Sequence, residues 1–168
     1  MSVSEPSDFL RDEVWCERVF NGDWIRPLGG TNSVREPATG EVLTVTGLAD
    51  AADIAFASLN AARVQPAWAA LGPRERAEIF RKAAALAQQH FAELALYIAR
   101  ESGGSLFKGE HEVREAIVLL HQAAGLLSQP HGLVLPSEAG RLSYARRLPH
   151  GVVGVISPFN FPLVLSLR

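Results

Sequence analysis

The chain has 168 residues, of which 48% are hydrophobic and 20% are charged, a composition typical of one soluble globular domain with a sizeable core. The 16 Lys and Arg residues nearly balance the 18 Asp and Glu residues, and the formal net charge is -2. This balance gives no electrostatic reason to expect nucleic acid or an anionic membrane surface as a partner.

Cys16 is the single cysteine of the sequence, which excludes an internal disulfide and a metal site built from paired cysteines. The five histidines have no spacing typical of ligands, so we expect no metal site. Residues 1–15 lack the basic region and apolar run of a signal peptide, and the apolar stretches 151–156 and 161–165 are too short to span a bilayer. We therefore expect a cytoplasmic protein without a membrane partner.

Turn signals dominate the start of the chain. Asn21-Gly22 lies between the short apolar runs 19–20 and 24–25 and predicts a hairpin, because glycine accepts the positive φ of a tight turn. Residues 37–40 predict a second turn, and the alternating sequence 42–46 predicts a strand after it.

The middle of the chain is predicted to be helical. Asp50 is placed to cap the first helix, which Pro66 is expected to end or kink. Pro73 favours a helix start, and Gly103 favours a helix end in the left-handed conformation. The helical apolar stripes span residues 52–62, 77–87, 91–98 and 113–127, the last of them ending before Pro130.

The last third changes period and predicts extended structure. Residues 142–149 indicate an extended segment, and the β-branched run 151–157 is typical of a strand buried on both faces of a parallel sheet. Residues 158–162 form a proline-flanked loop, and a helix can begin at Leu163. Helices followed by the first strand of a parallel sheet make the expected fold class α/β.

The segment 149–163, PHGVVGVISPFNFPL, resembles the strand-loop-helix signature of the aldehyde dehydrogenase superfamily. Three upstream segments agree in order and spacing: VFNGDW at 19–24, EPATGE at 36–41 and PRERA at 73–77. Glu36 stands where the family pattern has Asn, and Phe159 stands where its loop usually has Trp. The run from Ser157 to Arg168 looks most like the benzaldehyde and vanillin dehydrogenase branch, a hint of aromatic aldehyde substrates.

The resemblance implies a two-step oxidation of an aldehyde to the carboxylic acid. A cysteine thiolate attacks the aldehyde, hydride passes to NAD or NADP, and water assisted by a glutamate releases the acid. The resemblance places Asn160 at the oxyanion of the tetrahedral intermediate, a role that suits an amide NH2 because it donates without titrating. It also implies that Ile156, Ser157, Pro158 and Phe159 line the cofactor cleft.

The resemblance further implies that residues 1–168 are an incomplete NAD(P)-binding domain, with helices packed on the start of a Rossmann-like parallel sheet and without the catalytic domain. An extended segment at about 141–149 would belong to the hairpin through which family members form dimers or tetramers. The nucleophilic cysteine and the general-base glutamate of the family have no counterpart here, and Cys16 matches no family motif. We therefore predict that the chain alone does not oxidise aldehydes.

Other interpretations of the same residues stay open. Asn160 between two prolines is also a good turn former. Gly151 and Gly154 precede and interrupt the predicted strand, so they do not form a dinucleotide fingerprint, which needs glycines after the strand. A non-catalytic helical interaction module derived from the same fold is the alternative to an enzyme fragment.

Overall fold

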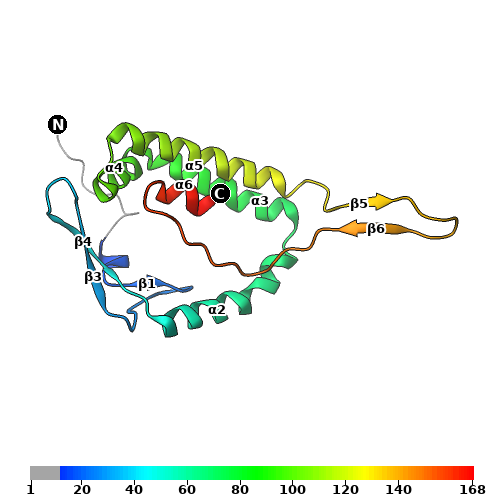
Figure 1. Cartoon of the computed structure of the whole chain (residues 1–168), viewed down its shortest axis with the longest axis horizontal. Helices are drawn as coiled ribbons and strands as arrows, with labels where there is room; N and C mark the ends of the chain where they lie inside the picture. Colours follow the sequence, from blue (N-terminus) through cyan, green and yellow to red (C-terminus); the bar gives the residue numbers. More distant parts are fainter. Residues whose placement is uncertain (1–11) are drawn as a thin grey trace.

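A computed structural model describes residues 12–168, so residues 1–11, including most of the stretch without signal-peptide features, lie outside the described part. Figure 1 shows a group of helices above, a group of strands at one end and a hairpin that projects from the other end. The helices are α1 (Asp12–Trp15), α2 (Ala51–Ala70), α3 (Pro73–Gln89), α4 (Phe91–Ser102), α5 (Leu106–Leu126) and α6 (Pro162–Leu167). The strands are β1 (Val19–Phe20), β2 (Trp24–Ile25), β3 (Thr31–Arg35), β4 (Val42–Gly47), β5 (Gly132–Leu135) and β6 (Ser143–Arg146).

The strands form antiparallel pairs. The predicted hairpin at Asn21-Gly22 is confirmed as β1 paired with β2, with Gly22 at a φ of 118°. The predicted strand is confirmed as β4, and it pairs with β3, which the sequence analysis did not predict. The turn between them is fixed to α4, because Arg100 donates to the Glu36 carboxylate at 3.1 Å and thereby lowers the pKa of Glu36.

Helix α2 begins at the predicted cap. The Asp50 carboxylate accepts from the backbone N–H of Ala52 and Asp53, and the Asp53 carboxylate accepts in return from the N–H of Asp50. Hydrogen bonds from the N–H groups of Asp50 and Leu28 hold the pKa of the Asp53 carboxyl below its usual range. Pro66 does not end this helix, because α2 continues to Ala70.

Helix α5 is the centre of the helical bundle, since α3, α4 and α6 all pack against it. The predicted helix start at Pro73 and the left-handed end at Gly103 are both confirmed. The buried apolar residues come from α3, α4 and α5: Ala77, Ala84, Ala95, Ile98, Val113, Ala116, Leu120 and Ala124. Most of them are alanines, so the helices approach one another closely. None of the described helices has the length and apolarity needed to cross a membrane.

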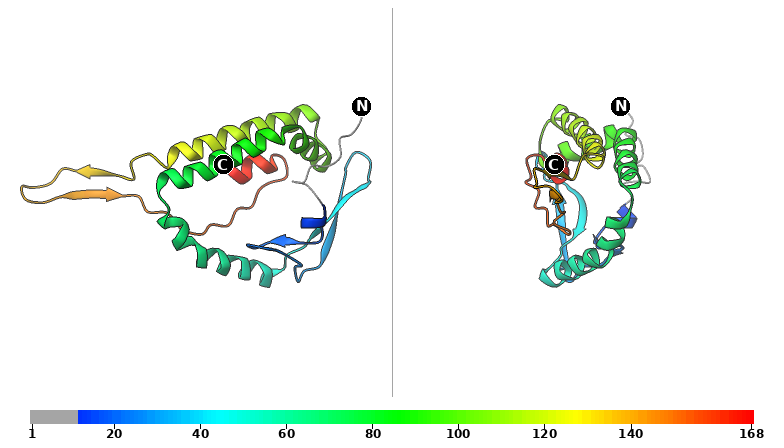
Figure 2. Two further views of the ribbon diagram at one scale, coloured as in Figure 1. Left: turned by 180° about the vertical axis from the view of Figure 1, so that it is seen from behind. Right: turned by 90° about the vertical axis from the view of Figure 1, so that its right-hand side faces the viewer.

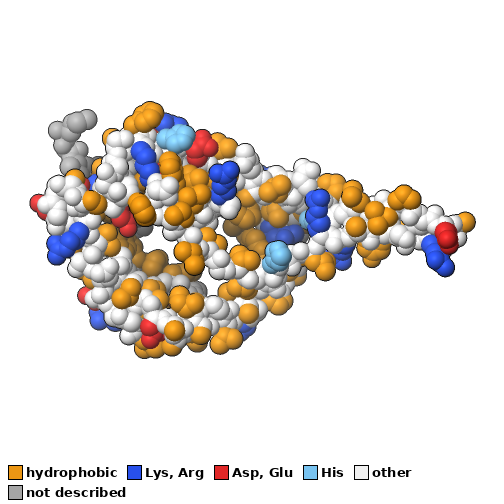
Figure 3. All heavy atoms as spheres, in the orientation of Figure 1, with side chains coloured by type: hydrophobic (Ala, Val, Ile, Leu, Met, Phe, Trp, Pro, Cys, Tyr) orange, Lys and Arg blue, Asp and Glu red, His pale blue; other side chains and the backbone are white. Residues whose placement is uncertain are grey.

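The hairpin formed by β5 and β6 projects away from the bundle, as both Figure 1 and the reverse view in Figure 2 show. The predicted extended segment is confirmed in β6, and its partner β5 was not predicted. Apolar side chains cover this hairpin without being buried, among them Leu133, Val134 and Tyr144 (Figure 3).

The prediction of a buried strand over 151–157 is wrong for the structure of residues 12–168. This segment forms no strand and no parallel sheet, and the side chains from Val152 to Ile156 are exposed. A strand requires a hydrogen-bonded neighbour. Each sheet of the described residues consists of two antiparallel strands, and none of them pairs with residues 151–157. The mixture of helices and strands agrees with the predicted α/β class, but in a partial form.

Gly109 provides a test of the close packing in the bundle. A Cβ at Gly109 in α5 would overlap the backbone carbonyl oxygen of Ala95 in α4, whereas a Cβ at Gly125 of the same helix would meet nothing within 4 Å. We expect Gly109→Ala to lower the free energy of unfolding by about 1–3 kcal/mol, because overpacking outweighs the better helix propensity of alanine.

The matched control is Gly125→Ala, which we expect to raise the free energy of unfolding by up to about 1 kcal/mol. Chemical denaturation of both variants measures the difference. Equal effects of the two substitutions would contradict the packing of α5 on α4 described above.

Candidate functional site

The predicted site residues lie on and beside a short loop between the unpaired segment and α6. We call residues 157–162 the Asn160 loop. Its two ends are joined, because the Ser157 hydroxyl donates to the backbone carbonyl oxygen of Pro162 at 2.8 Å. Phe159 and Asn160 form the turn between these ends, and Pro158 and Pro162 restrict the backbone on either side. The loop therefore presents Asn160 at its tip, with an exposed side chain.

The far end of the Asn160 loop is held by Glu112 of α5, whose side chain is 0% exposed. Its Oε1 accepts from the backbone N–H of Leu163 at 2.6 Å and from that of Val164 at 3.3 Å. Its Oε2 accepts from Lys108 Nζ at 2.5 Å, and the same ammonium lies 4.9 Å from the centre of the Phe161 ring. The carboxylate therefore satisfies donors at the start of α6 that would otherwise lack partners.

The four residues predicted to line a cofactor cleft differ in what they offer. Ile156 is 98% exposed and Phe159 is 85% exposed, so both apolar side chains are available to a flat ring. The Ser157 hydroxyl is already used inside the loop, and Pro158 is exposed. Residues 151–160 include no Lys or Arg that would neutralise cofactor phosphates. These residues fit one apolar wall of a nicotinamide cofactor site and supply no phosphate site.

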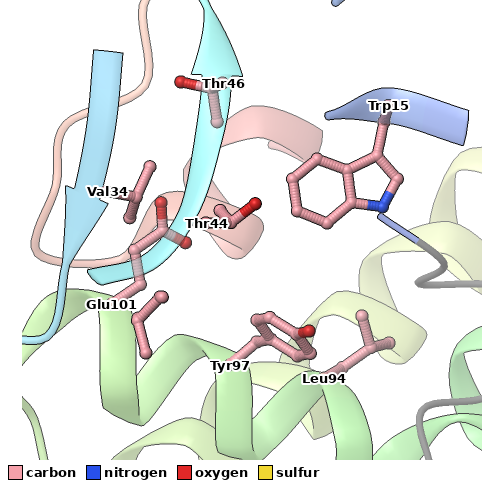
Figure 4. A pocket seen from close by; sticks show the side chains of 8 residues that line it. Trp15, Val34, Thr44, Thr46, Leu94, Tyr97 and Glu101 are labelled. Carbon is pink, nitrogen blue, oxygen red and sulfur yellow. The ribbon is translucent and has the colours of Figure 1, made fainter. Parts of the chain in front are cut away.

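A cavity of about 210 Å³ lies elsewhere, between the β3–β4 pair and α4. Figure 4 shows Trp15, Thr44 and Tyr97 around it, and none of the predicted site residues lines it. A second cavity of about 380 Å³ lies beside α3 and α5 and does not contain Asn160 either. The predicted residues therefore sit on an open surface and not in either of these hollows.

Metal-ligating clusters and thiols add nothing to this site. Among residues 12–168, no group of three or more His, Cys, Asp or Glu side chains is arranged to hold a metal ion. Cys16 is a free, half-buried thiol just after α1, and the next residue, Glu17, donates its backbone N–H to the carbonyl oxygen of Val45 in β4.

Glu112 and Lys108 are the residues of this site that the sequence analysis did not predict. A signal for them exists in the sequence, because Glu112 falls on the apolar face of α5 with Val113 and Ala116. An acidic residue on a face that packs into a core is unusual unless it is paired. Lys108 stands four residues earlier, one helical turn away, which is the spacing of such a pair.

Comparison with known proteins identifies the family. The sequence profile of the Aldehyde dehydrogenase family matches residues 24–168, so the chain belongs to this family. It is 52% identical over 160 residues to the vanillin dehydrogenase of an Amycolatopsis species, covering 95% of this chain and 33% of that protein. It is 42% identical over 156 residues to the NAD(+) benzaldehyde dehydrogenase of Pseudomonas putida, covering 92% of this chain and 32% of that protein.

Solved structures give the same answer. The NAD-dependent benzaldehyde dehydrogenase of Corynebacterium glutamicum superposes with a TM-score of 0.82 at 32% identity, covering 89% of this chain and 33% of that one. PnpE in complex with nicotinamide adenine dinucleotide superposes with a TM-score of 0.84 at 32% identity, and the match covers 90% of this chain and 32% of that one. The chain thus spans about a third of the length of these relatives. The resemblance to the benzaldehyde and vanillin dehydrogenase branch is confirmed.

Proposed function

We propose that residues 1–168 are the N-terminal part of the NAD(P)-binding domain of a cytoplasmic aldehyde dehydrogenase that oxidises an aromatic, benzaldehyde-like aldehyde. The main support is the Asn160 loop, which is closed by Ser157, anchored by Glu112 and carries an exposed carboxamide at its tip. The relatives named for vanillin and benzaldehyde support the substrate class.

The overall reaction converts an aldehyde, NAD(P)+ and water to a carboxylic acid, NAD(P)H and a proton. The Asn160 amide NH2 donates a hydrogen bond to the substrate oxygen as negative charge develops there, and it does so at any pH because it does not titrate. Ile156 and Phe159 bind the face of the nicotinamide cofactor and exclude water from it. The bound cofactor supplies the hydride acceptor, and it is NAD or NADP.

The thiol nucleophile and the carboxylate base of this reaction lie outside residues 1–168 in our proposal. Cys16 does not take the role of the nucleophile, because it precedes the β1–β2 hairpin and matches no motif of the family. The 168-residue chain is therefore inactive by itself, and the full-length enzyme contains it as the N-terminal third.

The same proposal gives the β5–β6 hairpin a role in assembly. Its strands carry apolar side chains that are exposed in this chain, with Val134 77% exposed and paired across the strands with Tyr144. A projecting ribbon with an apolar surface favours association, because its strand edges also carry unpaired backbone groups. We propose that residues 141–149 and their partner strand join copies of the enzyme into a dimer or tetramer.

The purified 168-residue chain should not reduce NAD in the presence of benzaldehyde, because it supplies an oxyanion donor but no nucleophile. NADH absorbance measures the reaction, with the full-length enzyme as the positive control. Turnover by the chain above a buffer blank would overturn the proposal that the nucleophile lies outside it.

The role of Asn160 can be tested in the full-length enzyme. Asn160→Ala should lower kcat about 100- to 1000-fold, because one oxyanion donor is removed. Asn32→Ala is the matched control, since Asn32 is an exposed asparagine in β3, and it should leave kcat unchanged. Steady-state kinetics with benzaldehyde decides, and a similar kcat in both variants would contradict the assigned role.

The role of the β5–β6 hairpin in assembly can be tested by placing a charge on its apolar surface. Val134→Asp in the full-length enzyme should shift the protein toward monomer, because it places a charge on the apolar surface of the hairpin. Glu138→Lys changes a charge in the exposed loop between β5 and β6 and serves as the control. Light scattering measures the mass, and an unchanged oligomer in the Val134 variant would exclude this face as the interface.

A further inference from the structure

We propose that Glu112 is a positioning residue that sets the place of Asn160 by holding the start of α6. This inference rests on the proposed function, because it assigns a purpose to Glu112 only if the Asn160 carboxamide takes part in the reaction. Glu112 does not touch the tip of the loop, and it acts through the backbone of Leu163 and Val164.

The charge of Glu112 is buried inside the bundle. A carboxylate that is fully removed from water is costly unless its oxygens are paired. Here both oxygens are used, one by the N–H groups of Leu163 and Val164 and the other by Lys108. Removing any of these partners leaves a buried charge or a buried donor unpaired, so the arrangement is specific to one position of α6.

The carboxylate of Glu112 fixes α6 in a way that an apolar residue would not. Helix α6 has an apolar residue, Leu163, that already packs on the cluster of Ala95, Ile98 and Val113. Burial of Leu163 alone holds the helix against the bundle but allows it to slide or rotate, because apolar contacts are not directional. The charge-assisted hydrogen bonds from two successive N–H groups fix its direction as well.

The segment between Asn160 and Leu163, which Glu112 holds, is short. Asn160 is three residues from Leu163, and the Ser157–Pro162 hydrogen bond closes the loop on the other side. Phe161 lies under the Lys108 ammonium that pairs with Glu112. A displacement of the start of α6 is therefore passed to Asn160 over a stiff segment and not absorbed by a flexible one. A displacement of about 1 Å can lower a rate about a hundredfold.

The test compares variants of the full-length enzyme. Glu112→Leu removes both acceptor oxygens while filling the space, and Glu112→Gln keeps one neutral acceptor oxygen. Glu110→Ala is the control, since it removes the ion pair between Glu110 and Arg114 on the same helix without touching the Asn160 loop. Asn160→Ala and the double variant that combines Glu112→Leu with Asn160→Ala complete a double-mutant cycle.

We expect Glu112→Leu to lower kcat by about tenfold to a hundredfold, with KM for benzaldehyde nearly unchanged. The loss in Glu112→Gln should be smaller, and Glu110→Ala should retain the full kcat. In the Asn160→Ala background, Glu112→Leu should cause no further loss, because its effect passes through Asn160. A residue with a merely structural role would lower kcat equally in both backgrounds.

A second measurement does not depend on turnover. Hydrogen exchange at the Leu163 and Val164 amides should be faster in Glu112→Gln than in the unsubstituted enzyme, because a neutral acceptor binds these donors more weakly than a carboxylate. Exchange within α3 should stay unchanged. If Glu112→Leu yields no folded enzyme, Glu112→Gln decides by its kcat and by this exchange.

The outcomes separate the two proposals. Full kcat in the Glu112 variants, together with a large loss in Asn160→Ala, would overturn the positioning role and leave the proposed function intact. Full kcat in Asn160→Ala would overturn the role of Asn160 and the positioning role with it. Unchanged exchange at Leu163 and Val164 in Glu112→Gln would also overturn the positioning role.

Discussion

The buried carboxylate of Glu112 is the point at which the helical bundle and the Asn160 loop are joined. Helix α6 is too short to be stable by itself, and it packs mainly against α5. Glu112 supplies hydrogen-bond acceptors for its first N–H groups, and Leu163 supplies its contact with the core. This attachment, together with the contact of Lys108 with the Phe161 ring, fixes the segment that carries Asn160 to the bundle.

The rest of the chain is held much more loosely than the bundle. The core consists mainly of alanines, whose burial contributes less than that of larger side chains. Large apolar residues such as Ile54, Val155 and Ile156 are exposed instead, and the segment 151–157 has no strand neighbour. This distribution is typical of a surface that a further part of a protein covers, and it agrees with a chain that spans a third of the length of its relatives.

Local signals in the sequence were sufficient for α2 to α5 and for the tight hairpin, whereas the short helix α1 was not predicted. The Asp50 cap, the Pro73 start and the Gly103 end depend on a few neighbouring residues, and each of them is confirmed. Strands β3 and β5 were missed because their pairing depends on residues elsewhere in the chain and their own sequences are short. The segment 151–157 has the composition of a buried strand, but composition cannot supply the neighbouring strands that would bury it.

In the candidate site, too, the sequence motif could be recognised in advance, whereas the residues that hold it in place could not. The motif indicates which residue carries the chemistry, because Asn160 lies inside a recognisable stretch of sequence. It does not indicate what holds that residue, since the support comes from Glu112 on a helix far away in the chain. An i,i+4 Lys–Glu pair is usually a solvated pair of small value, so its spacing alone carries no function. What distinguishes Lys108 and Glu112 is their place on a helix face that is otherwise apolar. Removing this pair from water costs free energy, and the hydrogen bonds that Glu112 accepts from the backbone N–H groups of α6 offset that cost.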